Sequence, residues 1–317
     1  MGKDSWFMKQ AAARGVVHGL DPAAYDPEYV SEQLKRLSKV FGPGRYFDVH
    51  VHGWDNVPKQ PTMMVSNHSG GTTVLDGLGM MTAWYGHFGV DRPVHGLAHE
   101  LVFATHTTGR YFERCGLLRA RFDTAERALR DHGHSVLVMP GGDQDVWRPA
   151  SQRYDVCFAG RTGYARTAIR LGTPVLPIAH AGAHHTLHVL AKGRRIAKAF
   201  GIHKVARADV FPVHLSFPWG LTIGPWPHLP PPARFDYAIG KPIKPPAIIP
   251  PGRPIPDEVV LAYDAEIRAS IQSLLDELKQ LRRREPSRME ALAHRAVRRM
   301  ARRVLREPSS EDLAFER

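Results

Sequence analysis

Cysteine is scarce in this sequence. Cys115 and Cys157 are the only two among 317 residues, and their spacing fits neither a disulfide framework nor a zinc knuckle. This excludes the class of small domains that several disulfides hold together. Free thiols in a reducing compartment are the simplest interpretation.

Long apolar runs are also missing. A membrane-spanning helix needs about 20 consecutive apolar residues. The nearest candidates, Leu78–Val90 and Pro174–Leu190, are too short or too rich in histidine. The N-terminal sequence MGKDSWFMKQAAARG lacks the apolar centre of a secretory signal. We therefore expect a cytoplasmic protein that is soluble, or peripheral at the cytoplasmic face of a membrane.

Acidic residues are outnumbered by basic ones. Lys and Arg total 43 against 31 Asp and Glu, which gives a formal charge of +12 and a pI near 9.9. A basic balance indicates nucleic acid, an anionic membrane or a phosphorylated substrate as partner. Much of the excess is local, since residues 281–306 hold ten arginines against two glutamates without a recognised nucleic-acid-binding motif. We expect an anionic membrane surface as partner, and no nucleic acid.

Apolar residues make up 43% of the chain, enough for a sizeable core. Short apolar runs predict strands at 46–52, 62–66, 93–97, 135–139 and 175–179. Helical spacing predicts helices at 5–20, 26–41, from 74, and at 124–131, 161–171, 257–281 and 289–306. The alternation predicts an α/β fold: a mixed, largely parallel sheet flanked by helices, with N- and C-terminal helical extensions. The proline-rich residues 225–256 are expected to form a surface segment or a linker.

One histidine stands where α/β folds place their chemistry. In VSNHSGGTTVLDG (residues 65–77), a buried strand delivers His68 to its carboxyl end. A histidine there can take a proton from a hydroxyl if a carboxylate holds its other ring nitrogen, and Asp76 is the nearest acid downstream. Gly70 and Gly71 allow close backbone approach and are candidate oxyanion donors. The pattern also fits a histidine that caps a helix beside a glycine turn.

Several blocks of the sequence, taken in order, resemble the lysophospholipid acyltransferase superfamily, especially its glycerol-phosphate and mono- and diacylglycerol acyltransferase-like branch. The blocks are NHSGG…D (67–76), YFERCGLLRARFDTA (111–125), VMPGGDQDVWRP (138–149) and PVLPIAHAG (174–182), followed by FPWGL (217–221) and IGKPI (239–243). The resemblance covers about residues 45–250. Two features depart from the usual pattern. Seven residues rather than four separate His68 from Asp76, and Gly141-Gly142 replaces the common Glu-Gly.

The resemblance implies an O-acyltransferase of phospholipid synthesis that acts at a membrane surface. It would move a fatty acyl group from acyl-CoA, or from acyl-carrier protein, to a hydroxyl of glycerol 3-phosphate or a lysophosphatidate. A neutral mono- or diacylglycerol is the alternative acceptor. His68 would be the general base and Asp76 would orient it, with no cofactor, no metal and no acyl-enzyme. The implied organisation is N-terminal helices at 1–44, possibly in contact with the membrane, an acyltransferase domain at 45–256 and basic C-terminal helices at 257–317.

Arginines in or near these blocks are candidates for binding a phosphate of the acceptor, because the guanidinium fork matches phosphate oxygens. The candidates are Arg121, Arg161, Arg119 and Arg148. Surface ion pairing is the other interpretation of each. Gly141 and Gly142 belong to the predicted substrate site and are further oxyanion candidates. Asp143 and Asp145 could bind an acceptor hydroxyl or anchor a nearby arginine.

Other function classes rest on weaker patterns. A serine hydrolase or esterase needs a Gly-x-Ser-x-Gly elbow, and the nearest string, GHSVL (133–137), lacks the last glycine. A histidine cluster contains pairs four residues apart that could share a helix face and bind zinc, although the glutamate of a zinc protease is missing. Its members are His180, His184, His185 and His188. Residues 78–90 suit a buried core helix or an acyl-chain tunnel.

The chain ends offer two candidate membrane contacts. The helix expected at 289–306 has one apolar stripe and is otherwise rich in arginine, a pattern typical of a helix lying in an anionic interface. A helix packed on the domain with a solvated basic face fits the same pattern. Near the N-terminus, Trp6, Phe7 and Met8 lie beside basic residues and form the second candidate. If the protein is not an enzyme, the alternative function is that of a basic protein that binds anionic surfaces.

Overall fold

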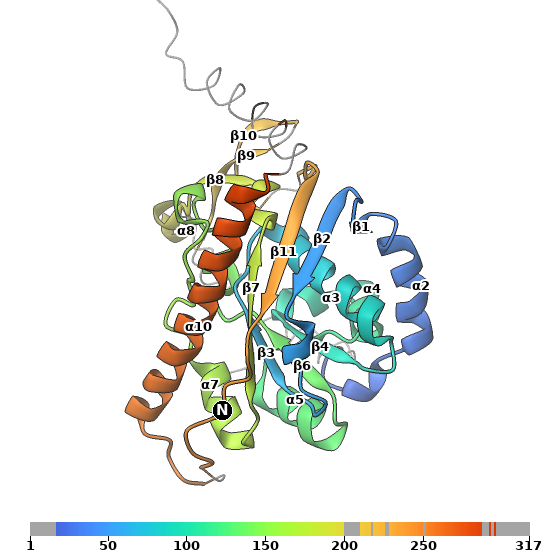
Figure 1. Ribbon diagram of the computed structural model, residues 1–317, viewed down its shortest axis with the longest axis vertical. Coiled ribbons are helices and arrows are strands. Elements are labelled where there is room, and N and C mark those ends of the chain that lie inside the picture. The colour runs from blue at the N-terminus through green and yellow to red at the C-terminus, as the bar shows by residue number, and fades with distance from the viewer. Residues whose placement is uncertain are drawn as a thin grey trace, which may run out of the picture.

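The computed structural model describes residues 17–199, 210–216, 218–225, 228–249 and 252–286, together with Leu292 and Arg295. Within these residues, eight strands form one central sheet in the order β1-β2-β11-β7-β3-β6-β4-β5 (Figure 1). The strands are β1 Phe41–Gly42, β2 Phe47–His52, β3 Met63–Ser66, β4 Val94–Ala98, β5 Leu118–Arg119, β6 Ser135–Val138, β7 Val175–Ala181 and β11 Ala233–Ile239.

The sheet is mixed and largely parallel, as the sequence predicts. β3 pairs in parallel with both β6 and β7, and β4 in parallel with β5 and β6. β11 is the exception, antiparallel to β7 and parallel to β2. Every residue of β7 is buried, because helices cover both faces of the sheet there.

Helices cover both faces of the central sheet, and an apolar core lies between the sheet and the helices on each face. The sheet side chains alternate between the two cores: Met64 belongs to the core beneath α2 and α3, and Met63 to the core beneath α7 and α10. The two clusters hold most of the large buried apolar side chains. The helices are α2 Pro27–Leu37, α3 Leu75–Phe88, α4 His106–Arg114, α5 Phe122–Glu126, α6 Gly142–Val146, α7 Gly163–Leu171, α8 Arg194–Ala199 and α10 Asp257–Arg284, with a π-helical turn at Arg127–Asp131 after α5.

The second predicted helix is shorter than expected. Its start follows from the sequence, because the Asp26 carboxylate accepts from the Tyr29 backbone N–H at 2.9 Å and proline occupies the first turn. The helix ends at Leu37 instead of residue 41. Phe41 starts β1 and pairs with Phe47, so its burial in the sheet outweighs the helical spacing of the preceding residues.

The prediction that residues 225–256 form a surface segment or linker is wrong for β11. This strand lies between β2 and β7, inside the sheet. Flanking prolines end the strand without interrupting it, since Ala233–Ile239 contains no proline. Its Phe235 and Tyr237 are fully buried, and Tyr237 reaches the site described below.

Helix α10 lies along one face of the sheet, against β7 and β11 (Figure 1). Its apolar stripe, which includes Ile267 and Ile271, belongs to the core. Near its end, Arg282 forms a buried ion pair with Asp236 of β11 at 2.5 Å. The predicted helix at 257–281 is thus confirmed. The helix expected at 289–306 lies outside the described residues except for Leu292 and Arg295. The one expected at 5–20 lies outside them up to residue 16, and residues 17–20 are not helical.

A second, three-stranded antiparallel sheet stands beside the carboxyl ends of the parallel strands. It consists of β8 His188–Ala191, β9 Val213–Ser216 and β10 Gly220–Ile223, in the order β10-β9-β8. Short helix α8 follows β8. In the part of the chain that is described, no helix combines the length and the apolar character needed to cross a bilayer.

Candidate active site

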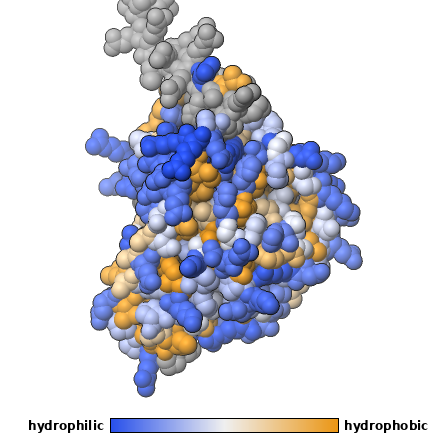
Figure 2. Space-filling view, in the orientation of Figure 1, coloured by the Kyte–Doolittle hydropathy of each residue, from blue (hydrophilic) through white to orange (hydrophobic). Residues whose placement is uncertain are grey.

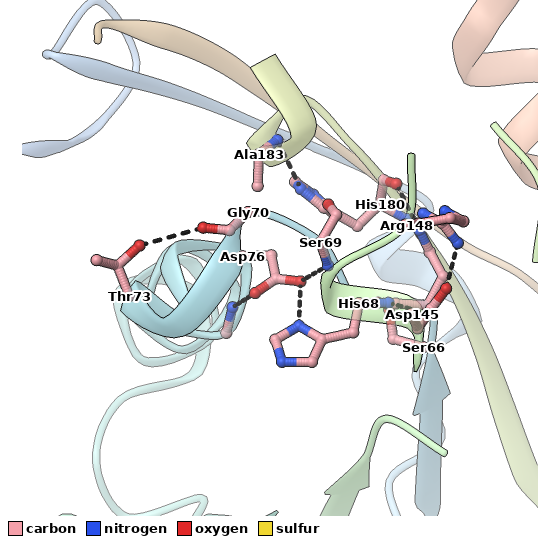
Figure 3. A network of polar contacts seen from close by, with 12 residues as sticks. Ser66, His68, Ser69, Gly70, Thr73, Asp76, Asp145, Arg148, His180 and Ala183 are labelled. Carbon is pink, nitrogen blue, oxygen red and sulfur yellow. Dashed lines mark hydrogen bonds and ion pairs between the residues drawn. The ribbon is translucent and has the colours of Figure 1, made fainter. Parts of the chain in front are cut away.

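His68 and Asp76 meet at the carboxyl end of β3. The Nδ1 atom of His68 lies 2.7 Å from the Oδ2 atom of Asp76 (Figure 3). The Asp76 side chain is fully buried, and that of His68 is largely buried. With Nδ1 donating to the carboxylate, the lone pair of a neutral imidazole lies on Nε2.

The long loop between the two residues folds back on itself. A 3₁₀ turn at Gly71–Thr73 follows Gly70, and Val74 adopts a left-handed conformation with φ of 48° before α3 begins. Asp76 therefore lies in the first turn of α3, where the backbone N–H groups of Ser69 and Gly77 each donate to its carboxylate at 2.8 Å. These contacts show how seven intervening residues still bring Asp76 to His68.

Two neighbouring strands fix the loop from the other side. Asn67 pairs with the backbone of His180 in β7: its Nδ2 donates to the carbonyl at 2.9 Å, and its Oδ1 accepts from the N–H at 2.7 Å. The Tyr237 hydroxyl of β11 donates to the Asp76 carbonyl at 2.7 Å. Asn67 and Tyr237 are both buried, so polar contacts tie the site to β7, which is next to β3, and to β11, which is next to β7.

Asp145 of α6, the short helix after β6, forms a third anchor. Its Oδ2 accepts from the His68 backbone N–H at 2.6 Å, and its Oδ1 forms an ion pair with Arg148 (Figure 3). All three groups are buried or nearly so. The guanidinium also donates to the Asp155 carbonyl. Asp145 thus fixes the backbone of His68, while Arg148 compensates the buried carboxylate.

The charges of the site raise the proton affinity of His68. Burial by itself lowers the pKa of an imidazole, but the charge of Asp76 and its hydrogen bond outweigh burial and raise the pKa of His68 above 6.5. Burial likewise favours protonated Asp76, yet pairing with His68 keeps the pKa of Asp76 below 3.8. Burial lowers the pKa of nearby His180 to about 4, so this ring is neutral at pH 7.

The four arginines predicted to bind substrate lie in different environments. Arg119 is buried, and its Nε donates to the His18 carbonyl at 2.7 Å. Arg148 is held by Asp145. Arg121 and Arg161 are substantially exposed, with Arg121 paired to Asp123, and Arg161 paired to Asp143 while donating to the Gly141 carbonyl at 2.9 Å. Of these four arginines, Arg161 has an exposed guanidinium and also contacts Gly141, just before α6.

The predicted glycines are needed for close packing. A Cβ atom at Gly141 would lie 2.3 Å from the Asp145 Cβ, and one at Gly142 would lie 2.5 Å from the Arg161 Nη1. Gly70 and Gly71 both have positive φ, and a Cβ at Gly70 would press on Ala183. These positions therefore bring backbone close to the site's own side chains.

The structure also gives the positions of the alternative motifs. Ser135 begins β6, at the end opposite His68, and its hydroxyl accepts from the Thr62 backbone N–H at 3.2 Å. The histidine cluster does not share a helix face, since its members are divided among β7, the 3₁₀ turn Ala183–His185 and β8. Helix α3 buries Met80 and Trp84 in the core, which agrees with the core interpretation of residues 78–90.

Sequence reasoning did not identify the roles of Asn67, His180 and Tyr237. Asn67 stands next to His68 in the first block, and this adjacency was a usable signal. Tyr237 carried none, because its segment lay between proline-rich stretches. For Asp145, the anchoring role matches one of the two interpretations considered.

Known proteins resemble this chain over the residues that form the candidate active site. The family model described as Acyltransferase matches residues 48–181. An uncharacterized protein of Mycobacterium tuberculosis is 27% identical over 227 residues, covering 71% of this chain and 60% of that protein, and one of Mycobacterium leprae is 25% identical over 225 residues, covering 71% and 58%. The chain thus spans about 60% of the length of these relatives.

Two similar proteins have descriptions that state an activity. A chicken (Gallus gallus) protein described as a DGAT1/2-independent enzyme synthesizing storage lipids is 24% identical over 178 residues, covering 56% of this chain and 51% of that protein. Among solved structures, the 1-acyl-sn-glycerophosphate (LPA) acyltransferase PlsC from Thermotoga maritima aligns with a TM-score of 0.42 and 20% identity, covering 77% of this chain and 81% of that chain.

Proposed function

We propose that the protein, whose residues 48–181 match the Acyltransferase family model, transfers a fatty acyl group from a thioester to a hydroxyl of a glycerolipid. The observation that carries the proposal is the 2.7 Å contact between His68 Nδ1 and buried Asp76 at the end of a central strand. A base held in this way can activate a hydroxyl.

The proposed reaction is a direct transfer. Nε2 of His68 removes the proton of the acceptor hydroxyl while its oxygen attacks the thioester carbonyl. The carbon–sulfur bond then breaks, and the proton passes from Nε2 to the departing sulfur. Asp76 fixes the tautomer of the neutral imidazole and stabilises the transient imidazolium. The step needs neither a covalent acyl-enzyme nor a redox partner.

The negative oxygen of the tetrahedral intermediate needs nearby donors. The backbone N–H groups of His68 and Ser69 are already directed to Asp145 and Asp76. The next groups along the loop belong to Gly70 and Gly71, and we assign the oxyanion to this stretch. Gly141 and Gly142 are the second choice, because their places are explained by packing against Asp145 and Arg161.

For the donor we propose acyl-CoA, with acyl-carrier protein as the alternative. For the acceptor we propose glycerol 3-phosphate or a lysophosphatidate. Arg161, exposed beside the Gly141–Gly142 turn, is the first candidate to bind the phosphate, and Arg121 is the second. Because the products are membrane lipids, the reaction is proposed to occur at a membrane surface, where the protein is peripheral on the cytoplasmic face.

A neutral mono- or diacylglycerol is the second candidate acceptor. Arg119 and Arg148 are bound to other groups of the protein, so only two of the four candidate arginines are substantially exposed. Fewer arginines available for a phosphate favour an acceptor without one. The chicken relative, described as synthesizing storage lipids, agrees with this alternative.

An acceptor screen tests the proposal. Purified protein is incubated with one radiolabelled acyl-CoA and, separately, glycerol 3-phosphate, lysophosphatidate, monoacylglycerol and diacylglycerol. We expect labelled lipid with a phosphate-bearing acceptor, and none from protein with His68 replaced. Labelled product with neutral acceptors alone would select the second candidate. Free fatty acid as the sole product would identify a hydrolase instead.

A further inference from the structure

The outer face of the three-stranded sheet exposes apolar side chains. In β10, Leu221 and Ile223 point to the same side and are each about half exposed, at 48% and 49%. Trp219, in the turn before β10, is 60% exposed. Figure 2 shows apolar surface at this end of the molecule, where β9 and β10 lie. We call Trp219, Leu221 and Ile223 the β10 patch.

The opposite face of the same sheet packs toward the candidate active site. His214 of β9 stacks on Trp147, with ring centroids 5.6 Å apart. Below them, Gly71 is so close that an added Cβ would lie 2.7 Å from Leu187 and 3.3 Å from His228. The small sheet therefore lies between the His68 loop and the β10 patch. One face of this sheet packs toward the loop, and the other face carries the patch.

Basic side chains follow β8, the edge strand opposite β10 in the small sheet. Helix α8 directly follows β8 and carries exposed Arg195 and Lys198. In the whole segment 186–232, the sequence has six Lys and Arg against a single acid, Asp209. Apolar side chains with cations and almost no acids fit a surface that is anionic at its headgroups and apolar beneath them.

We infer that the β10 patch and helix α8 together bind an anionic lipid bilayer, with Trp219 and Leu221 entering the interfacial region and Arg195 and Lys198 contacting lipid phosphates. This deepens the proposed function, on which it rests, because it would bring the His68 loop to the surface that holds the acceptor. A tryptophan at such a depth is favourable, since its ring is amphipathic.

The test uses full-length variants and vesicle flotation. The vesicles contain phosphatidylcholine, with or without phosphatidylglycerol. We expect Trp219→Ser/Leu221→Ser to weaken binding to anionic vesicles by roughly tenfold, and Arg195→Glu/Lys198→Glu to do the same while reducing the salt dependence of binding. The matched control, Ile248→Ser/Leu261→Ser, removes side chains that are 68% and 57% exposed elsewhere and should bind like the wild type.

Circular dichroism and thermal unfolding show whether each variant is folded, and turnover of detergent-dispersed acceptor is measured separately. Folded variants of the β10 patch and of α8 that keep this turnover and lose vesicle binding support the inference. The inference is overturned if both variants float as well as the wild type, or if the control variant loses as much binding as they do. A wild type that floats but transfers no acyl group would contradict the proposed function alone.

Discussion

At the scale of single residues, the proton affinity of His68 depends mainly on its burial and on the buried carboxylate of Asp76. Burial lowers the pKa of the imidazole, and Asp76 raises it by more, through its charge and its hydrogen bond. The protonated form is therefore stabilised up to a pH above 6.5, and the form that can accept a proton from a hydroxyl is populated above that pH.

The pH dependence of activity follows from this balance. As pH falls through the raised pKa, His68 becomes protonated and cannot act as a base, so the acidic limb of kcat/KM should lie above pH 6.5. Asp76→Asn removes the charge and leaves burial to dominate, which should move the limb below pH 6.5 along with a lower maximum. A pH series of both proteins checks this. An unmoved limb in Asp76→Asn would separate the limb from the His68–Asp76 pair.

A phosphate contact can be tested at Arg161. If its guanidinium binds the acceptor, Arg161→Ala should raise the acceptor KM by about tenfold, the low end expected for a hydrogen bond to a charged group because the side chain is exposed. The KM of acyl-CoA should change less. Arg121→Ala serves as the second candidate. An unchanged acceptor KM in both would favour a neutral acceptor.

At the scale of secondary-structure elements, the position of α3 on the sheet determines where Asp76 lies. The helix approaches β11 so closely that an added Cβ at Gly79 would lie 2.6 Å from the Tyr237 hydroxyl oxygen and 3.1 Å from Phe235. That hydroxyl donates to the Asp76 carbonyl. The glycine therefore permits both the packing and the anchor.

Gly79→Ala should consequently destabilise the protein. Displacing buried Tyr237 is expected to cost about 1–3 kcal/mol of unfolding free energy and to lower activity with it. Gly86→Ala is the matched control on the same helix, since a Cβ there meets nothing within 4 Å. Alanine should stabilise that position by up to about 1 kcal/mol. Thermal melts of both variants measure the difference, and equal stabilities would argue against the close contact.

The limits of sequence prediction are also visible in the elements. The strands near His68 could be predicted because their short apolar runs end in loop residues. Helix α10 could be predicted because its apolar residues recur at regular helical spacing. β11 could not, since prolines surround it and its burial depends on neighbours distant in sequence. The return of Asp76 to His68 needed a 3₁₀ turn and a left-handed Val74, neither of which a residue count indicates.

At the scale of the whole molecule, the order of the motifs carried more information than any single motif. The match to the Acyltransferase family model at residues 48–181 agrees with the resemblance to acyltransferases, although each block alone was weak. The composition indicated a basic protein, but it did not indicate which basic side chains are exposed in the folded structure. Two of the four arginines drawn from the motifs are engaged inside the protein, because an arginine in a block can serve packing as readily as binding.

The arginine-rich C-terminal sequence remains a predicted membrane contact. Deleting residues 286–317 should weaken binding to anionic vesicles and reduce its salt dependence, because each basic residue near such a surface contributes about 1 kcal/mol. Turnover of detergent-dispersed acceptor should largely survive, since the motifs end near residue 250. Equal flotation of the truncated and intact proteins would assign docking to other parts of the chain.

His68→Ala tests most directly whether His68 removes the proton of the acceptor hydroxyl. The variant is compared with the wild type for acyl transfer from acyl-CoA, after circular dichroism and thermal unfolding have shown that it is folded. We expect a loss of at least about 100-fold in turnover, the lower range for removal of a general base. A folded His68→Ala protein that turns over at nearly the wild-type rate would contradict this role of His68.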